Sequence, residues 1–397
     1  MTTSLSQFDG PRLMRAQELI ASDELAHICF GGTELVDKEE APASYIPPRR
    51  GGIYILADQG RLVSRIGVTH FHLQMYAATI QVASIGGVCT HPDYRGQGLA
   101  SHLLDYCTQK LAQEGARLML ISGTRGLYTR LGNVPHGLYH CFSIKPGEFT
   151  GQRPSPAGLA LRRLTGDDAL TVSRLYQAEP VHFIRKISDF SETLQDPSRN
   201  TFAHADPWLV ERSGHALAYL FLGTPWGQAL EVPNRHVSEY AGSRLALVDA
   251  LQALLAAGNL QEIYWPVAWQ DVELVQMFQD CGLTGRLSSL DGQTLRIVNF
   301  PGLMKDLRPI LQARLGKALL RGLRFMQSGP LLGGSGSDRY AIVRGGERLD
   351  LDGAAMTRLV MGDAGSQAQP IRLSGALAEI IPAIFPLPSF LFGLNYR

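Results

Sequence analysis

The chain has 397 residues, with 37 Lys and Arg against 36 Asp and Glu. That length exceeds a single core, and at roughly 150 residues per domain it indicates two or three domains. The balanced charge and the lack of a Lys/Arg cluster argue against a nucleic-acid-binding protein.

The two ends of the chain give no sign of export or of membrane insertion. Residues 1–15 lack the apolar core of a signal peptide. The most apolar stretch, residues 376–394, contains Glu379 and three prolines. We therefore expect a packed terminus there and no membrane span.

The cysteines are scattered and show no metal-ligand spacing, so no metal is expected. Their odd number leaves at least one thiol unpaired, and a reducing cytoplasm is the expected compartment. They are Cys29, Cys89, Cys107, Cys141 and Cys281.

The first part of the chain predicts strands followed by a helix. Residues 53–57 and 62–68 flank the turn Asp58-Gln59-Gly60, a pattern typical of a hairpin. A β-branched, apolar segment at residues 80–90 predicts another strand, and a helix is expected from residue 99 to about residue 111.

A glycine-rich turn, Asp93-Tyr94-Arg95-Gly96-Gln97-Gly98-Leu99-Ala100, joins this strand to the helix. Gly96 and Gly98 lack the Cβ atoms that would hold the backbone away from a ligand, and the new helix offers unpaired N–H groups to an anion. Arg95 adds a guanidinium that can fork onto phosphate oxygens. The turn therefore predicts a pyrophosphate site, which is neither a P-loop nor a Rossmann fingerprint.

The chain contains an internal duplication. Residues 93–99 align on residues 239–245, and the register continues without a gap through the helix that follows each segment. Upstream, residues 208–212 and 216–222 around Ser213-Gly214 repeat the earlier hairpin. Two copies of one α/β fold are the natural inference.

The second copy has lost the residues that would hold a phosphate. Ala241 stands where the first copy has Arg95, and Arg244 stands where it has Gly98. An arginine side chain there crowds the path of a pyrophosphate. We therefore expect a scaffold domain with no cofactor of its own.

A third region begins near Arg296 and has another pattern. It predicts an amphipathic helix over residues 303–323, a glycine-rich loop, two strands at 340–344 and 348–351, and a helix over 351–362. This order resembles a sterol-carrier-protein-like α+β domain.

The spacing Arg95-x-x-Gly98-x-Ala100 after a strand resembles the acetyl-CoA-binding motif of the GCN5-related N-acetyltransferase (GNAT) superfamily. An intact copy, a decayed copy and a sterol-carrier-like tail together resemble the Eis-type (enhanced intracellular survival) acetyltransferases. The strongest motifs are residues 91–100 and 126–132. The resemblance implies an α/β (α+β) fold with a catalytic GNAT domain at 1–150, a degenerate GNAT domain at 151–297 and a sterol-carrier-like domain at 298–397.

The resemblance also implies an activity, a co-substrate and an assembly. Members of the family acetylate amines, from aminoglycosides to lysine side chains, and typically form hexamers. A polyamine is a further acceptor that we consider, and acetyl-CoA is the expected co-substrate. The residues expected to hold it are Val88, Cys89, Thr90, Arg95, Gly96, Gln97, Gly98, Leu99 and Ala100.

Tyr128 is the expected general acid, since it follows the predicted strand 118–122 and matches the family's general-acid tyrosine. Its phenol, with a reference pKa of ~10, stays protonated at neutral pH. Aligning Gly132 with Gly282 places Phe278 on Tyr128, so the second copy keeps the ring and lacks the hydroxyl. Backbone N–H groups of residues 88–90 are the expected oxyanion site.

The general base is less determined, because strand 80–88 carries no carboxylate. In Eis-type enzymes the C-terminal carboxylate enters the active site, which here implies Arg397. His70 and His72 share one face of a predicted strand and are the alternative. An acidic group, Glu34, Asp37, Glu39 and Glu40, is expected to attract a cationic acceptor.

Two other functions stay open from the sequence. The protein could bind acetyl-CoA and an apolar ligand without turnover, or it could use an acyl chain longer than acetyl. Pocket depth decides the second question, and the sequence does not show it.

Overall fold

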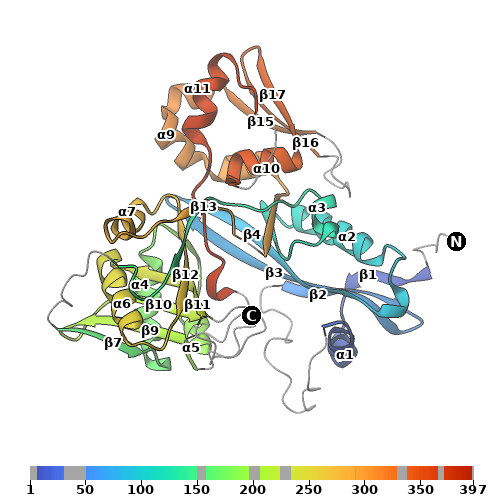
Figure 1. Cartoon of the computed structure of the whole chain (residues 1–397). Coiled ribbons are helices and arrows are strands. Elements are labelled where there is room, and N and C mark those ends of the chain that lie inside the picture. Colours follow the sequence, from blue (N-terminus) through green and yellow to red (C-terminus); the bar gives the residue numbers. More distant parts are fainter. Residues whose placement is uncertain are drawn as a thin grey trace.

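The computed structural model describes residues 7–30, 51–149, 158–195, 206–223, 234–290, 292–328, 338–364 and 371–395. These residues form a mixed α/β fold with two seven-stranded sheets and one three-stranded sheet (Figure 1). The expected α/β class is confirmed.

The first sheet has the order β1-β2-β3-β4-β5-β14, with β8 also paired to β3. Its strands are β1 (Asp9–Leu13), β2 (Gly51–Asp58), β3 (Arg61–Met75), β4 (Ala78–Thr90), β5 (Leu118–Ser122), β8 (Val181–Phe183) and β14 (Gln293–Ile297). The predicted hairpin and the predicted strand at 80–90 are confirmed as β2, β3 and β4. Of these pairings only β4–β5 is parallel.

Two helices cover opposite faces of this sheet. Helix α1 (Leu19–Phe30) packs through Leu25 against Ile53, Ile55 and Cys89. Helix α2 (Leu99–Gln113) packs on residues that alternate with those, among them Tyr54 and Leu56. The faces are distinct because successive side chains of a strand point to opposite sides.

The second sheet has the order β13-β6-β12-β11-β10-β9-β7. Its strands are β6 (Tyr139–Ile144), β7 (Leu159–Arg163), β9 (Asp206–Arg212), β10 (His215–Gly223), β11 (Asn234–Gly242), β12 (Glu262–Ala268) and β13 (Arg286–Ser288). Helices α4 (Ala169–Gln177) and α5 (Ile187–Gln195) share one buried cluster, and α6 (Arg244–Ala256) and α7 (Val272–Asp280) share another.

The two sheets exchange strands. Strand β6, from the first 150 residues, lies in the second sheet between β12 and β13. Strand β14, which follows the second sheet in the chain, pairs with β5 of the first sheet. Each of the two sheets therefore contains a strand from the other side of the boundary expected near residue 150.

The third region carries the three-stranded sheet β15-β16-β17. Its elements are α8 (Phe300–Asp306), α9 (Arg308–Arg321), β15 (Leu323–Ser328), β16 (Arg339–Arg344), β17 (Glu347–Asp352), α10 (Gly353–Met361) and α11 (Gly375–Ile384). The expected strands and the expected helix at 351–362 are confirmed as β16, β17 and α10. In the described parts of the chain, no helix is long and apolar enough to cross a membrane.

The single helix expected over residues 303–323 is wrong. The chain forms two helices there, α8 and α9, because Pro309 begins a new first turn. Gly316 then adopts a φ of +75° inside α9, which kinks it. Leu323 already belongs to β15. The apolar periodicity continues through these breaks, so the pattern alone did not reveal them.

After α11 the chain returns to the two sheets as a buried, mostly non-helical segment, residues 385–395 (Figure 1). Tyr139 Oη donates to Phe390 O at 2.7 Å, and Gln270 exchanges two hydrogen bonds with the backbone of Ser389. The ring of Phe392 lies 5.2 Å from that of Phe71 on β3. The expected packed terminus is therefore confirmed for the described residues.

His136 lies beneath this C-terminal segment, in the stretch between α3 (Gly126–Arg130) and β6. It is 1% exposed, and its ring is 5.4 Å from that of Phe390. Neither ring nitrogen has a hydrogen-bond partner among the described residues. Burial lowers the pKa of His136 from 6.5 to about 4.

We predict that protonation of His136 lowers the free energy of unfolding in mild acid. Its folded pKa lies below its unfolded pKa, so its contribution is complete above pH 6.5 and declines as the pH falls toward 4. By pH 5 the loss from this group is about 2 kcal/mol. Urea unfolding of the protein and of His136→Phe at pH 7.5 and 5 measures it. Equal pH dependence in the two proteins would exclude His136 as the source.

Candidate functional site

The glycine-rich turn has the conformation expected of an anion cradle. It lies between β4 and α2, and both Gly96 and Gly98 adopt a φ of +79°. A Cβ built on either glycine meets nothing within 4 Å, so open space lies beside the turn. Gly98 is the N-cap of the 15-residue helix α2, whose first N–H groups lack helical partners. The turn can therefore receive a pyrophosphate.

Two side chains hold this turn in place. Tyr94 Oη donates to Asp58 Oδ2 at 2.9 Å, which ties the turn to the β2–β3 hairpin. Arg95 is exposed, and its Nε donates to Thr90 O at 3.2 Å. The rest of the guanidinium is then available to a phosphate oxygen.

Strands β4 and β5 separate next to the turn. Their parallel pairing ends at Ile85 and Ile121, whereas β4 continues to Thr90. Its pairing with β3 also shifts register between Gly86 and Cys89, and Gly87 has a φ of +57°. Such a bulge re-aims the backbone. Val88, Cys89 and Thr90 thus lie where β4 has left β5, as expected for residues that contact a co-substrate.

Tyr128 lies one loop after β5, on the short helix α3. It is 4% exposed and belongs to the buried cluster beneath α2. Burial raises the pKa of its phenol, while Arg125 opposes the shift. The phenol therefore stays protonated throughout the neutral range.

The end of α3 repeats at the end of α7 in the second sheet. Asn133 N donates to Tyr128 O at 3.1 Å, and Leu283 N donates to Phe278 O at 3.0 Å. The glycines within these turns, Gly132 and Gly282, have φ values of +82° and +83°. The geometry matches the alignment that placed Phe278 on Tyr128.

The two candidate histidines lie on the face of the first sheet that α2 covers. His70 Nε2 is 3.4 Å from Glu114 Oε2, at the C-terminal end of α2, and His72 is exposed. Phe71, between them, lies on the opposite face together with Arg65, which donates to Ser22 O of α1. The structure therefore separates both histidines from Cys89 and α1.

Two expected groups lie outside the described residues. They are the acidic group at residues 34–40 and Arg397 itself. Asn395 is the last residue described, and its Oδ1 accepts a hydrogen bond from Arg185 Nε at 2.9 Å.

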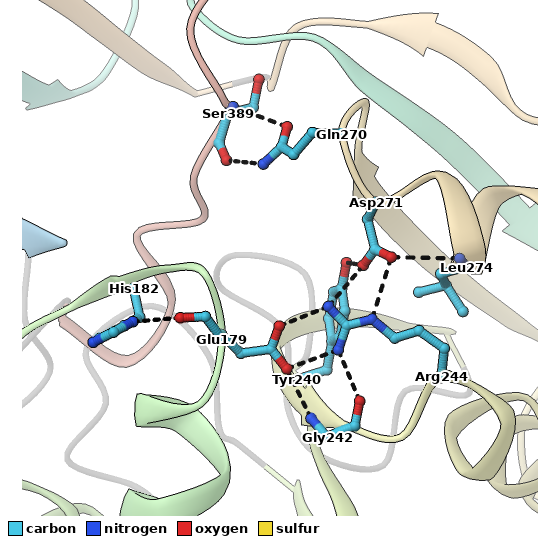
Figure 2. A network of polar contacts seen from close by, with 9 residues as sticks. All are labelled: Glu179, His182, Tyr240, Gly242, Arg244, Gln270, Asp271, Leu274 and Ser389. Atoms are coloured by element: carbon cyan, nitrogen blue, oxygen red, sulfur yellow. Dashed lines mark hydrogen bonds and ion pairs between the residues drawn. The ribbon is translucent and has the colours of Figure 1, made fainter. Parts of the chain in front are cut away.

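In the second sheet a half-buried ion-pair network fills the turn that corresponds to the cradle (Figure 2). Arg244 donates to both carboxylate oxygens of Glu179, at 2.7 and 2.6 Å, and its Nε donates to Asp271 at 3.2 Å. Glu179 also accepts from Gly242 N at 2.8 Å. A carboxylate of the chain thus takes a backbone N–H of this turn.

Sequence reasoning found Arg244 but missed Glu179. Glu179 follows α4, more than sixty residues before its partner, and lies outside the repeated segments. Its spacing from Arg244 carries no local signal. Among the residues that the structure describes, no group of His, Cys, Asp and Glu could hold a metal ion.

Residues 11–133 match the family model of the acetyltransferase (GNAT) domain. No curated protein matches the chain. The match includes β2 to β5, the cradle and Tyr128. The protein is therefore an acyltransferase with a GNAT domain.

Solved structures resemble most of the chain. A GCN5-related N-acetyltransferase from Anabaena variabilis has a TM-score of 0.62 at 14% identity, covering 97% of this chain and 98% of that one. One from Kribbella flavida has a TM-score of 0.57 at 15% identity, covering 88% and 84%. Eis1 from Mycobacterium abscessus has a TM-score of 0.57 at 14% identity, covering 88% and 89%. At these identities the likeness concerns the fold.

We predict that Gly98→Ala weakens acetyl-CoA binding about tenfold or more, because the added methyl group enters the space beside the turn. Gly60→Ala is the matched control. Gly60 has a similar φ of +87° and equally open surroundings, but it lies in the β2–β3 turn. Titration calorimetry with acetyl-CoA gives both affinities. Equal affinities in the two variants would remove Gly98 from the binding site.

Proposed function

We propose that the protein transfers the acetyl group of acetyl-CoA to a primary amine, with one acetyl-CoA bound per chain in the first sheet. One observation carries this proposal. The cradle at Gly96 and Gly98 opens into free space at the start of α2, next to the place where β4 and β5 separate. The corresponding turn of the second sheet is filled by Glu179 and Arg244.

In this proposal the cradle and the end of β4 divide the binding of acetyl-CoA. The pyrophosphate lies on Arg95, Gly96, Gln97, Gly98, Leu99 and Ala100. The thioester lies along Val88, Cys89 and Thr90, whose backbone N–H groups stabilise the oxyanion. Side-chain identity matters little there, since backbone groups make the contacts. Burial in an apolar cluster suits Cys89 to a packing role.

The reaction needs a proton removed from the acceptor and a proton supplied to the leaving group. The neutral amine attacks the thioester carbonyl carbon, and the C–N bond forms as the C–O double bond opens to an oxyanion. When the oxyanion collapses, the C–S bond breaks and Tyr128 gives its phenolic proton to the coenzyme A sulfur. Its raised pKa keeps that proton available at neutral pH.

We assign the general base to the C-terminal carboxylate of Arg397. The segment before it packs on the face of the first sheet that carries Phe71 and Arg65. That face also holds the half-exposed Thr69 and Ser84, which lie opposite each other in register. His70 and His72 face α2, so they are less well placed to meet an acceptor amine.

Finer points of the proposal rest on the family resemblance. The acceptor is an aminoglycoside, a polyamine or a lysine-like amine, attracted by the acidic group at residues 34–40. Residues 1–150 form the catalytic domain, 151–297 a degenerate GNAT-like scaffold, and 298–397 a sterol-carrier-protein-like domain. We further propose a cytoplasmic hexamer.

The activity test measures thiol release from acetyl-CoA with a panel of polyamines, aminoglycosides and lysine peptides. We predict release above background for at least one acceptor and about 10²-fold slower turnover in Tyr128→Phe, the scale of a lost general acid. Phe278 occupies the equivalent site of the second copy, so the variant is expected to fold. Acetyl-CoA affinity should stay within a few-fold.

No release across the panel would contradict the proposal, and longer acyl-CoA donors in the same assay test the acyl length. An unchanged rate in Tyr128→Phe would remove Tyr128 from its role.

A C-terminal extension tests Arg397. Adding three glycines moves the terminal carboxylate several ångströms along the chain, and we predict that kcat falls at least about tenfold while acetyl-CoA binding is unchanged. The same extension at the N-terminus is the control. Full activity of the C-terminally extended protein would exclude the carboxylate as the base.

A further inference from the structure

A buried ion pair links the segment after β8 to β11 and to the C-terminal segment. Arg185, just after β8, donates to both carboxylate oxygens of Glu239 on β11, at 2.9 and 2.7 Å. The two residues are 8% and 3% exposed. The guanidinium also lies 4.2 Å from the centre of the Tyr176 ring. The pair is thus enclosed within the second sheet and its helices.

The C-terminal segment completes the hydrogen bonding of this pair. Glu239 Oε1 accepts a second bond from Tyr219 Oη at 2.9 Å, and Glu239 Oε2 accepts one from Leu394 N at 3.1 Å. Arg185 Nε donates to Asn395 Oδ1 at 2.9 Å. The pair therefore binds Leu394 through its backbone and Asn395 through its side chain.

The backbone at Gly393 is shaped to this contact. Gly393 has a φ of +55°, and a Cβ there would collide with the Glu239 carboxylate. Only a residue without a side chain brings Leu394 N within reach of Glu239. This close approach is an observation separate from the hydrogen bonds, and it supports the same contact. We call the position of residues 393–395 on Arg185 and Glu239 the seat.

The seat lies against the first sheet. Strand β8 pairs with β3, and Ile184 N donates to His72 O at 2.7 Å, directly before Arg185. Glu179 and Arg244 hold the chain just before β8, and Arg185 and Glu239 hold it just after β8. We call this segment, residues 179–185, the strap. Phe392 contacts Phe71 of β3 beside it. The second sheet therefore holds the C-terminal segment against the face of the first sheet that carries Phe71. We assign the acceptor amine to this face.

Removing two charges from water costs several kcal/mol, so a buried pair is weak evidence for stability. Its better-attested use is to specify one arrangement. Here that arrangement is the position of residues 393–395, because Leu394 N binds Glu239 and the Asn395 side chain binds Arg185. The two residues that follow span at most about 7 Å.

We infer that Arg185 and Glu239 are positioning residues, which hold the C-terminal segment so that its end lies at the acceptor face of the first sheet. The catalytic part of this inference rests on the proposed role of Arg397. The seat itself does not, because it is defined by described contacts alone.

The direct test compares Gly393→Ala with Gly345→Ala. Gly345 has a φ of +57° in the β16–β17 turn, and a Cβ there meets nothing within 4 Å, so the control carries the same backbone strain without the collision. Hydrogen–deuterium exchange of a peptide covering residues 386–395 should be at least about tenfold faster in Gly393→Ala, and unchanged in Gly345→Ala. Equal exchange in the two variants overturns the seat.

Activity then tests the positioning role. Gly393→Ala should lower kcat at least about fivefold and leave the KM for acetyl-CoA unchanged, because the co-substrate binds at the other end of β4. In a chain that stops after Asn395, the terminal carboxylate is already displaced by two residues, so Gly393→Ala should lower kcat little further. Faster exchange with unchanged kcat overturns the catalytic part and leaves the seat standing.

A second pair of variants removes one charge from each end of the strap. Glu239 accepts four donors, and a glutamine there has one acceptor oxygen, so Glu239→Gln should also speed exchange at residues 386–395. Glu179 binds Arg244 and Gly242 at the other end of the strap, so Glu179→Gln should speed that exchange less than Glu239→Gln does. Similar exchange in both variants would contradict a specific seat at Glu239. An inactive wild-type protein would refute the proposed function, while the exchange data would still report on the seat.

Discussion

The exchange of β6 and β14 between the two large sheets is the constraint on which the rest of the structure depends. Each sheet is completed by a strand that the chain supplies from the other side of the expected boundary. Since an unpaired strand edge leaves backbone groups without partners, neither sheet is complete alone. The C-terminal segment and β8 add further contacts between the acetyltransferase domain and the second sheet.

Within this frame, the same local architecture has two opposite uses. In the first sheet, glycines with left-handed backbone leave a turn open at the start of α2. In the second sheet, Arg244 begins α6 and binds Glu179, so the turn is closed by the chain's own carboxylate. In both cases the backbone N–H groups at the start of the helix favour an anion. In the first copy these groups are open to a ligand. In the second copy Glu179 accepts from Gly242 N and Arg244, which also fixes the chain before β8.

The electrostatics of the molecule follow the same division. At the candidate site, burial is the main cause of the raised pKa of Tyr128. Beside the second sheet, Arg185 forms a buried pair with Glu239, and Arg244 forms a half-buried pair with Glu179. These paired charges hold chain segments in position, whereas the chemistry that we propose for the first sheet uses backbone groups, Arg95, the Tyr128 phenol and the terminal carboxylate.

Features that depend on neighbouring residues were determined by the sequence itself. The β2–β3 hairpin, strand β4, the left-handed glycines of the cradle and the start of α2 all follow from turn chemistry and periodicity over a few residues. The correspondence of Tyr128 with Phe278 came from comparing the chain with itself. The break between α8 and α9 was missed, because apolar periodicity continued across Pro309 and Gly316.

Only the tertiary structure decided which strands share a sheet, where Glu179 and Glu239 find their partners, and on which face His70 and His72 lie. Each of these depends on contacts between residues far apart in the chain. Such contacts are selected by complementary shape and charge in the folded molecule, and spacing along the sequence carries no record of them.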